Sequence, residues 1–197
     1  PNVIESVGYI QPKVQIEIGC RSLREPLKIA EFNTLVDEYY PNASFAMPVI
    51  NVPTVIPERT FLEKIFLLHE EFSKPTQAIR VERLSRHLYD VYQLSKTEIK
   101  QNAINDTELY ETIVKHRYNF TRISKVDYNL HQPQTINPIP PTEVIKAWET
   151  DYSTMLTEMI YGDAPTFEEL IKELTQLKSE INKLVWKMKT EFPLPKS

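Results

Sequence analysis

The sequence predicts an α+β fold: a small, partial sheet of mixed or antiparallel strands, followed by a C-terminal helical bundle. Two observations predict it. Up to about Val55, β-branched residues alternate with polar ones, which is the side-chain period of a strand. From Pro57 onward, apolar residues recur every three or four positions, which is the period of an amphipathic helix. We therefore divide the chain into a sheet portion, residues 1–56, and a helical lobe, residues 57–197.

The sheet portion contains three stretches with strand-like sequence. The apolar face of the first is formed by Val14, Ile16 and Ile18. The other two are parts of residues 28–40 and of residues 45–56, and the prolines of the last stretch favour an edge strand or a broken one. Because extended sequence begins by about residue 8 and the chain starts with proline, we expect it to be the downstream piece of a longer protein.

The helical lobe contains five predicted helices. They span residues 57–72, 79–95, 107–123, 142–160 and 166–189. The last has the clearest start signal, because Thr166 and Glu169 have the spacing of a capping box. Its apolar stripe consists of Phe167, Leu170, Leu174, Leu177, Ile181, Leu184 and Met188. We interpret this stripe as intramolecular core, with a partner-binding coiled coil as the alternative.

Composition narrows the class of protein. With 197 residues, 41% hydrophobic and 25% charged, the chain has the composition of a soluble globular protein. Its net charge of −4 requires any nucleic-acid contact to use a local basic patch. Apolar runs are far shorter than the ~20 residues that span a bilayer, so no membrane contact is expected and the cytoplasm is the expected location. Cys20, His69 and His131 lack the spacing of zinc ligands.

Lys64 raises a question about the first predicted helix, "ERTFLEKIFLLHEEF". The buried stripe of this helix is formed by Phe61, Ile65, Leu68 and Phe72. Lys64 lies beside that stripe, one helical step from two of its members. Either its methylene groups cover Phe61 while the ammonium reaches water, or the ammonium serves a site.

Other ionisable side chains are candidates for chemistry. Glu17 projects from the polar face of the first strand. In the next helix, Arg83, His87 and Asp90 fall at i, i+4 and i+7 and are expected to share one face. Such a face can bind phosphate and move protons, although a solvated, salt-bridged surface is the alternative.

A local basic patch occurs in "KHRYNFTRISK". Its side chains that can carry positive charge are Lys115, His116, Arg117, Arg122 and Lys125. Tyr118 and Phe120 lie between them, and this mixture can pair with phosphates and stack on unpaired bases. We interpret the patch as RNA-facing, with the alternative that the aromatic rings belong to the core.

Three stretches, "VIPERTFLEKIFLLHEE", "RLSRHLYDVYQL" and "DYSTMLTEMIYGDAPTFEELIKELTQLKSEIN", resemble the nucleotidyltransferase AbiEii toxin family of type IV toxin–antitoxin systems. The resemblance extends from about Val14 to Asn182. It implies a polymerase-β-type nucleotidyltransferase, in which a small mixed sheet carries metal-binding carboxylates and adjoins a helical lobe. It also implies transfer of nucleotides from an NTP, in some members to tRNA 3′ ends, in abortive infection and phage defence.

The resemblance implies roles for individual residues. The family's lysine–isoleucine–acid strand motif aligns with Gln15, Ile16 and Glu17, so the lysine is replaced but Glu17 keeps the position of a Mg²⁺ ligand. Lys64 matches the lysine that binds the NTP phosphates, with Glu58 or Glu63 as its acidic neighbour, and Asp90 matches the aspartate near the acceptor hydroxyl. The catalytic residues implied are Glu17, Lys64 and Asp90, and the expected substrate-binding residues are Arg83, His87, Lys115, Arg117 and Arg122. We expect the three catalytic residues to converge on one cleft at the junction of sheet and helices.

Two features of the family are missing from this sequence. It has no glycine–serine turn and no Asp-x-Asp, whereas two-metal catalysis needs several carboxylates around the ions. We therefore expect the chain to be inactive alone, with further Mg²⁺ ligands on an upstream segment, and to expose its sheet around Ile16 or cover it in a dimer.

The resulting prediction is the C-terminal portion of an NTP-dependent nucleotidyltransferase toxin acting on RNA, with tRNA as the expected acceptor. A cognate antitoxin is expected to act without touching the chain. The alternative is a non-catalytic helical module that binds RNA or a protein on the same scaffold.

Overall fold

The computed structural model describes residue 16 and residues 26–195. In this part of the chain there are a two-stranded antiparallel sheet and seven α-helices, which confirms the predicted α+β class. Within the first predicted strand, Val14, Glu17 and Ile18 lie outside the described residues, and Ile16 is exposed.

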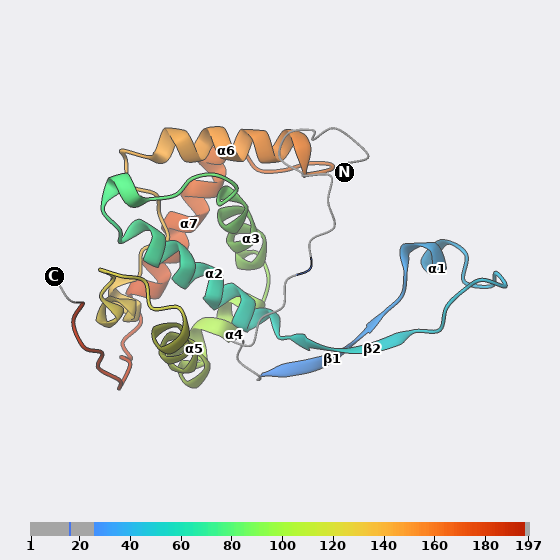
Figure 1. The fold of residues 1–197 in the computed structure, drawn as a ribbon, viewed down its shortest axis with the longest axis horizontal. Coiled ribbons are helices and arrows are strands. Elements are labelled where there is room, and N and C mark those ends of the chain that lie inside the picture. Colours follow the sequence, from blue (N-terminus) through green and yellow to red (C-terminus); the bar gives the residue numbers. More distant parts are fainter. Residues whose placement is uncertain (1–15, 17–25, 196–197) are drawn as a thin grey trace.

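The two strands form an arm that projects from the helices (Figure 1). Strand β1 (Leu27–Phe32) pairs with β2 (Ile50–Val55) in a register that places Leu27 opposite Val55. Each strand of a two-stranded sheet is an edge, which fits the prediction made from the prolines of residues 45–56. Helix α1 (Leu35–Tyr39) lies at the far end of the arm, in a stretch where the sequence predicted only strand.

A single carboxylate organises the far end of the arm. Asp37 completes a capping box with Thr34 at the start of α1. Its other oxygen accepts a hydrogen bond of 2.9 Å from the backbone N–H of Met47, which returns toward β2. The loop between the strands is therefore tied together by Asp37.

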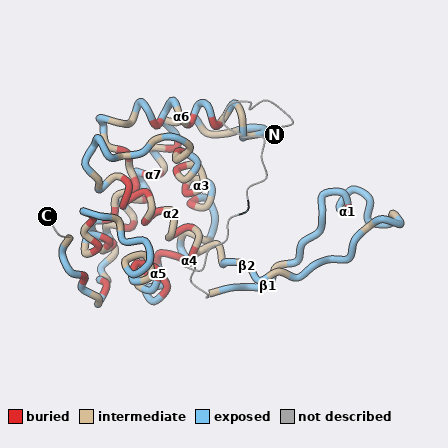
Figure 2. The backbone as a smooth tube through the Cα atoms, in the orientation of Figure 1, coloured by how far each residue is buried: buried red, intermediate tan, exposed pale blue. Residues whose placement is uncertain are grey.

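Most of the arm is exposed to solvent (Figure 2). Its large apolar side chains with an exposed fraction of 40% or more are Leu27, Ile29, Phe32, Leu35, Val36, Tyr39, Tyr40, Phe45, Met47, Val49, Ile50 and Val55. An isolated two-stranded hairpin is marginally stable in water, and exposed apolar surface of this extent marks an interaction site.

The helical lobe consists of six helices, and α2 lies at its centre (Figure 1). They are α2 (Pro57–Phe72), α3 (Ser85–Ser95), α4 (Ile99–Asn105), α5 (Thr107–Phe120), α6 (Ile145–Glu158) and α7 (Phe167–Asn182). Short 3₁₀ turns η1 (Thr76–Ala78), η2 (Tyr128–His131) and η3 (Pro133–Thr135) connect them. Helix α2 contacts α3, α4 and α5, and its side chains Phe61, Leu62, Ile65, Phe66 and Leu68 are fully buried. No helix among residues 26–195 is long and apolar enough to cross a membrane.

Helix α2 begins and ends at the predicted residues, but the other boundaries differ. Helix α4 was not predicted, and α5 and α6 are each shorter than predicted. Helix α3 begins at Ser85 instead of residue 79, and α7 ends at Asn182 instead of residue 189. The predicted capping box of Thr166 and Glu169 is present. The stripe Leu170, Leu174, Leu177 and Ile181 is fully buried, which confirms that it is core.

The start of α3 is determined by a residue distant in sequence. Arg83 adopts a left-handed backbone conformation, with φ of 60°, so the chain turns just before the helix. The backbone N–H groups of Arg83 and Ser85 donate to the Asp151 carboxylate of α6, at 2.7 and 3.0 Å. Asp151 therefore caps α3 in place of a local side chain.

A buried carboxylate, Glu70, joins α2 to α5 and η2. Its oxygen Oε1 accepts a hydrogen bond of 2.8 Å from Nε of Arg117 and lies 3.3 Å from Nε2 of His131. The His131 ring stacks on Tyr128, with 4.7 Å between the ring centroids. Burial raises the pKa of Glu70, but the hydrogen bonds from Arg117 and His131 outweigh it and lower the pKa to about 2.

We predict that Arg117→Met lowers the free energy of unfolding by about 3 kcal/mol or more, because it removes the guanidinium that compensates a buried charge. The matched control is Lys115→Met on the same helix, where a half-exposed lysine pairs with Glu111. That change should cost less than ~0.5 kcal/mol. Urea denaturation measures both, and equal losses for the two variants would contradict the prediction.

Candidate functional site

Lys64 and Asp90, which are 26 positions apart in the sequence, form an ion pair. Lys64 lies on α2 and Asp90 on α3, and the distance from Nζ to Oδ2 is 2.6 Å. Their side chains are 24% and 39% exposed, so the pair lies where the contact between the two helices reaches solvent. A ligand can therefore reach both charges.

Packing between α2 and α3 brings the pair together. Phe61 and Leu68 of α2 are fully buried, as are Leu88 and Val91 of α3. Lys64 lies at the border of the buried face of α2, and its side chain extends to Asp90. The unusual position of this lysine, noted in the sequence, is thus explained by its carboxylate partner on the next helix.

His87 lies one helical turn before Asp90 on α3. Burial and the positive charges of Lys64 and Arg86 lower the pKa of His87 to about 4, while Asp90 acts in the opposite direction. The imidazole is therefore neutral at pH 7. Its buried Nδ1 has no hydrogen-bond partner among the described residues. A neutral histidine beside a lysine–aspartate pair can accept a proton.

The expectation that Arg83 shares a helix face with His87 and Asp90 is wrong. Helix α3 begins only at Ser85, so Arg83 lies before the helix and its i, i+4 spacing to His87 does not place the two side chains on one face. The turn at Arg83 instead directs its backbone N–H to Asp151. Sequence reasoning missed Asp151, since its cap acts across more than 60 positions and leaves no local pattern.

The third predicted catalytic residue, Glu17, lies outside the described residues. The predicted convergence can therefore be followed only for Lys64 and Asp90. Of the two acids considered as neighbours of Lys64, Glu63 pairs with Arg59 at 3.0 Å, and Glu58 accepts a weak hydrogen bond from Asn102. Within residues 26–195, no three His, Cys, Asp or Glu side chains are grouped to hold a metal ion, so these residues alone do not fit a Mg²⁺ site.

The side chains of the predicted basic patch have different partners in the structure. Arg117 is buried against Glu70, and Lys115 pairs with Glu111 at 3.1 Å. Tyr118 packs against Tyr128 and Phe192, so this ring belongs to the core as the alternative stated. The guanidinium of Arg122 lies over the Tyr118 ring, 4.9 Å from its centroid.

Arg122 and Lys125 occupy a tight loop after α5. Both have left-handed backbone conformations, with φ of 28° and 67°. They line a pocket of about 250 Å³ together with Ser124 and Tyr128. Neither forms an ion pair with a carboxylate in the described part of the chain, so their charges remain available to a ligand.

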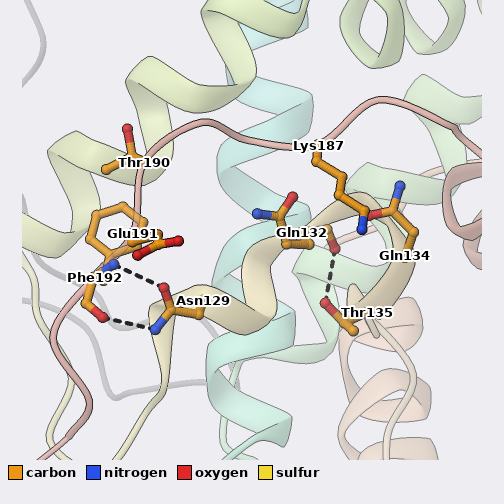
Figure 3. Close-up of a pocket in the computed structure, with 8 residues that line it drawn as sticks. All are labelled: Asn129, Gln132, Gln134, Thr135, Lys187, Thr190, Glu191 and Phe192. Atoms are coloured by element: carbon orange, nitrogen blue, oxygen red, sulfur yellow. Dashed lines mark hydrogen bonds between the residues drawn. The ribbon is translucent and has the colours of Figure 1, made fainter.

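A larger pocket of about 550 Å³ lies elsewhere, between η2, η3 and the C-terminal segment (Figure 3). Its lining consists of Asn129, Gln132, Gln134, Thr135, Lys187, Thr190, Glu191 and Phe192. Three of these eight residues carry side-chain amides, and the lining includes neither Lys64 nor Asp90. No sequence motif indicated this pocket.

Comparison with known proteins gave one match. The family described as nucleotidyl transferase AbiEii toxin, type IV TA system, matches residues 2–173. No curated protein and no solved structure matches the chain. The matched range includes α2, α3 and the Lys64–Asp90 pair.

We predict opposite changes in the pKa of His87 when either partner of the pair is neutralised. Lys64→Met should raise it, because a positive charge is removed, and Asp90→Asn should lower it. NMR titration of the imidazole signals measures both shifts. Unchanged values in both variants would show that the pair does not act on His87.

The stability of the chain should depend on pH through His87 and through a second buried histidine, His69. The pKa of His87 is about 4 in the folded chain against 6.5 as its ordinary value, and burial together with His131 lowers that of His69 to about 3. Between its ordinary pKa and its lowered pKa, each histidine binds more protons in the unfolded chain than in the folded chain. Stability is therefore fully present above pH 6.5 and is lost as the pH falls toward 4 and below, which denaturant midpoints at several pH values will measure.

Proposed function

Because the chain belongs to the nucleotidyl transferase AbiEii toxin family of type IV toxin–antitoxin systems, we propose that Lys64 and Asp90 form the phosphate-binding and acceptor-binding parts of a nucleotidyl transfer site. The observation that carries the proposal is the 2.6 Å pair between α2 and α3, open to solvent at the helix contact. RNA is the proposed acceptor, with tRNA as the class to test first, and the cytoplasm is the proposed location.

In the proposed reaction, a hydroxyl oxygen of the RNA forms a bond to the α-phosphorus of an NTP. The bond from that phosphorus to the bridging oxygen breaks, and pyrophosphate leaves. Lys64 neutralises charge on the phosphate oxygens, and Asp90 orients the hydroxyl and accepts its proton. The triphosphate carries more charge than one carboxylate, so it competes with Asp90 for Lys64 and releases Asp90 for the acceptor. His87, neutral at pH 7, lies one helical turn from Asp90 and is proposed to line the substrate-binding surface.

Magnesium is the proposed cofactor, and Glu17 is the proposed ligand on this chain. When bound, the ion would neutralise charge on the phosphates. The 197 residues contain neither Gly-Ser nor Asp-x-Asp, so we propose that the remaining carboxylates come from polypeptide outside them. The chain alone should then bind NTP without transferring it.

The exposed arm supports this division of the site. Its apolar side chains, such as Ile29, Phe32 and Ile50, are uncovered, and two strands form too small a sheet to be stable alone. We propose that the polypeptide carrying the missing carboxylates packs on the arm. A second copy of the chain covering the same face is the competing arrangement.

The proposed RNA surface comprises Arg122 and Lys125, and Lys115 of α5, which pairs with Glu111, is a further candidate. Arg117 is left out because its guanidinium is bound to Glu70. The competing function is a binding module without catalysis. There the Lys64–Asp90 pair would contribute ~1 kcal/mol or less to stability and nothing to turnover.

We predict that Lys64→Ala weakens NTP binding to the chain, whereas Asp90→Asn leaves binding largely intact. In protein that includes the carboxylate-bearing polypeptide, Asp90→Asn should lower incorporation of labelled NTP into total tRNA by ~10²–10⁴-fold, because a general base is lost. Calorimetry measures binding, and melting temperatures recorded alongside identify loss of fold.

The matched control is the pair of Lys100 and Glu180, which joins α4 to α7 at 2.9 Å with similar exposure. Lys100→Ala and Glu180→Gln should leave NTP binding and transfer unchanged. Near-normal incorporation by Asp90→Asn would remove it from the site and favour the binding module.

A further inference from the structure

After α7 the chain leaves the helix and runs in an extended form past η2, η3 and α5; we call residues 183–192 the tail. Asn129 forms two hydrogen bonds to the backbone of one tail residue, Phe192 (Figure 3). Its Oδ1 accepts from the N–H of Phe192 at 2.8 Å, and its Nδ2 donates to the carbonyl of Phe192 at 2.9 Å. Gln132 binds Met188 in the same way, at 2.7 and 3.3 Å.

Two further side chains bind the tail backbone. Nε2 of Gln134 donates to the carbonyls of Leu184 and Trp186, the latter at 2.9 Å. The Glu111 carboxylate of α5 accepts from the backbone N–H groups of Lys189 and Thr190, at 3.2 and 3.0 Å. We call these four side chains, Glu111, Asn129, Gln132 and Gln134, the tail groove. They hydrogen-bond to a peptide backbone as a neighbouring strand would.

The side chains of the tail alternate between the groove and solvent. Met188 and Phe192 are buried, and Trp186 packs edge-on against Tyr110, with 4.9 Å between centroids. Val185, the residue before Trp186, is 95% exposed, and Lys187, Lys189 and Glu191 are also exposed. This period of two is the pattern by which grooves recognise extended peptides: the backbone contacts give affinity, and alternate side chains give specificity.

The tail also has a second period. Leu184 and Met188 continue the apolar repeat of α7 after Ile181, which is why the sequence predicts helix as far as residue 189. Only Lys183 separates the end of α7 at Asn182 from Leu184, the first tail residue whose backbone is bound by the groove. Lys183 already has a right-handed helical backbone, with φ of −86° and ψ of −7°, so a change in backbone from Leu184 onward would continue α7 and carry the tail out of its own groove.

We propose that the tail groove is a peptide-binding site for extended segments with apolar residues at alternate positions, and that the tail of a second copy of this chain can occupy it. Exchange between two copies reproduces the contacts of the closed chain, so its main cost is the association of two molecules. Short hinges favour such exchange, and the hinge here is one residue. The pocket of about 550 Å³ beside the tail shows that the resident segment leaves part of the groove unfilled.

The groove is tested with a fluorescent peptide of sequence "KLVWKMKTEF" and a full-length variant, Met188→Asp with Phe192→Asp, whose own tail is released. This variant should bind the peptide at least tenfold more tightly than the unmodified chain, whose tail competes at a roughly millimolar effective concentration. Adding Gln132→Ala removes two backbone hydrogen bonds and should weaken binding about tenfold. Gln176→Ala is the control, because the Gln176 side chain bonds to Glu180 on the exposed side of α7, away from the groove residues.

Circular dichroism tests whether the released variant keeps its helices. If the helices are lost, the milder variant Phe192→Ala replaces it in the binding test. A folded released variant that fails to bind the peptide would overturn the groove.

Exchange is tested with two mass-tagged samples of the unmodified chain, mixed at high concentration and measured by native mass spectrometry after dilution. We expect mixed dimers, and more of them when Lys183 is deleted and the tail cannot reach its own groove. Only monomers in both samples would overturn exchange.

Discussion

The buried carboxylate of Glu70 is the constraint on which the rest of the lobe depends. An ionised group without contact to water must be compensated, and Arg117 from α5 and His131 from η2 do so together. The three elements cannot move apart without leaving a bare charge in the core. Helix α2, which carries Glu70, also carries Lys64, and η2 carries Asn129, which holds the tail. The two regions for which we propose a function are thus built on segments that one buried network keeps in place.

The Lys64–Asp90 pair has the opposite energetic character. It lies at the border of the lobe, where water screens both charges and neither is needed to hold the helices together. The contact between α2 and α3 instead rests on buried apolar side chains of both helices, such as Leu68 and Leu88. A charge pair that contributes little to stability can be separated by a ligand at small cost. The proposed transfer reaction requires this property, because in it Lys64 and Asp90 release one another to bind phosphate and hydroxyl.

Local sequence signals predicted those parts of the fold whose causes are local. Helix α2 was placed correctly because Pro57 marks its start and the Ser73–Pro75 stretch its end. Residues 79–84 were wrongly predicted as helix because the Asp151 carboxylate, far along the chain, determines where α3 starts. Residues 183–189 carry a true helical repeat, but backbone contacts from Gln132 and Gln134 favour the extended form. Of the candidate site, spacing predicted His87 and Asp90 on one face. The position of Lys64 beside an apolar stripe singled it out, and the resemblance to a family supplied its role. Only helix packing shows that Lys64 reaches Asp90.

The cap that Asp151 places on α3 has an evolutionary consequence. Because one carboxylate on α6 satisfies backbone groups at Arg83 and Ser85, these positions are linked although they are distant in the sequence. In related chains, loss of the acid at 151 should be accompanied by a local capping residue at the start of α3. Lineages that keep the remote cap inherit a helix whose orientation, and with it the direction of Asp90, depends on α6. Sequence change at position 151 of α6 is therefore restrained by the start of another helix.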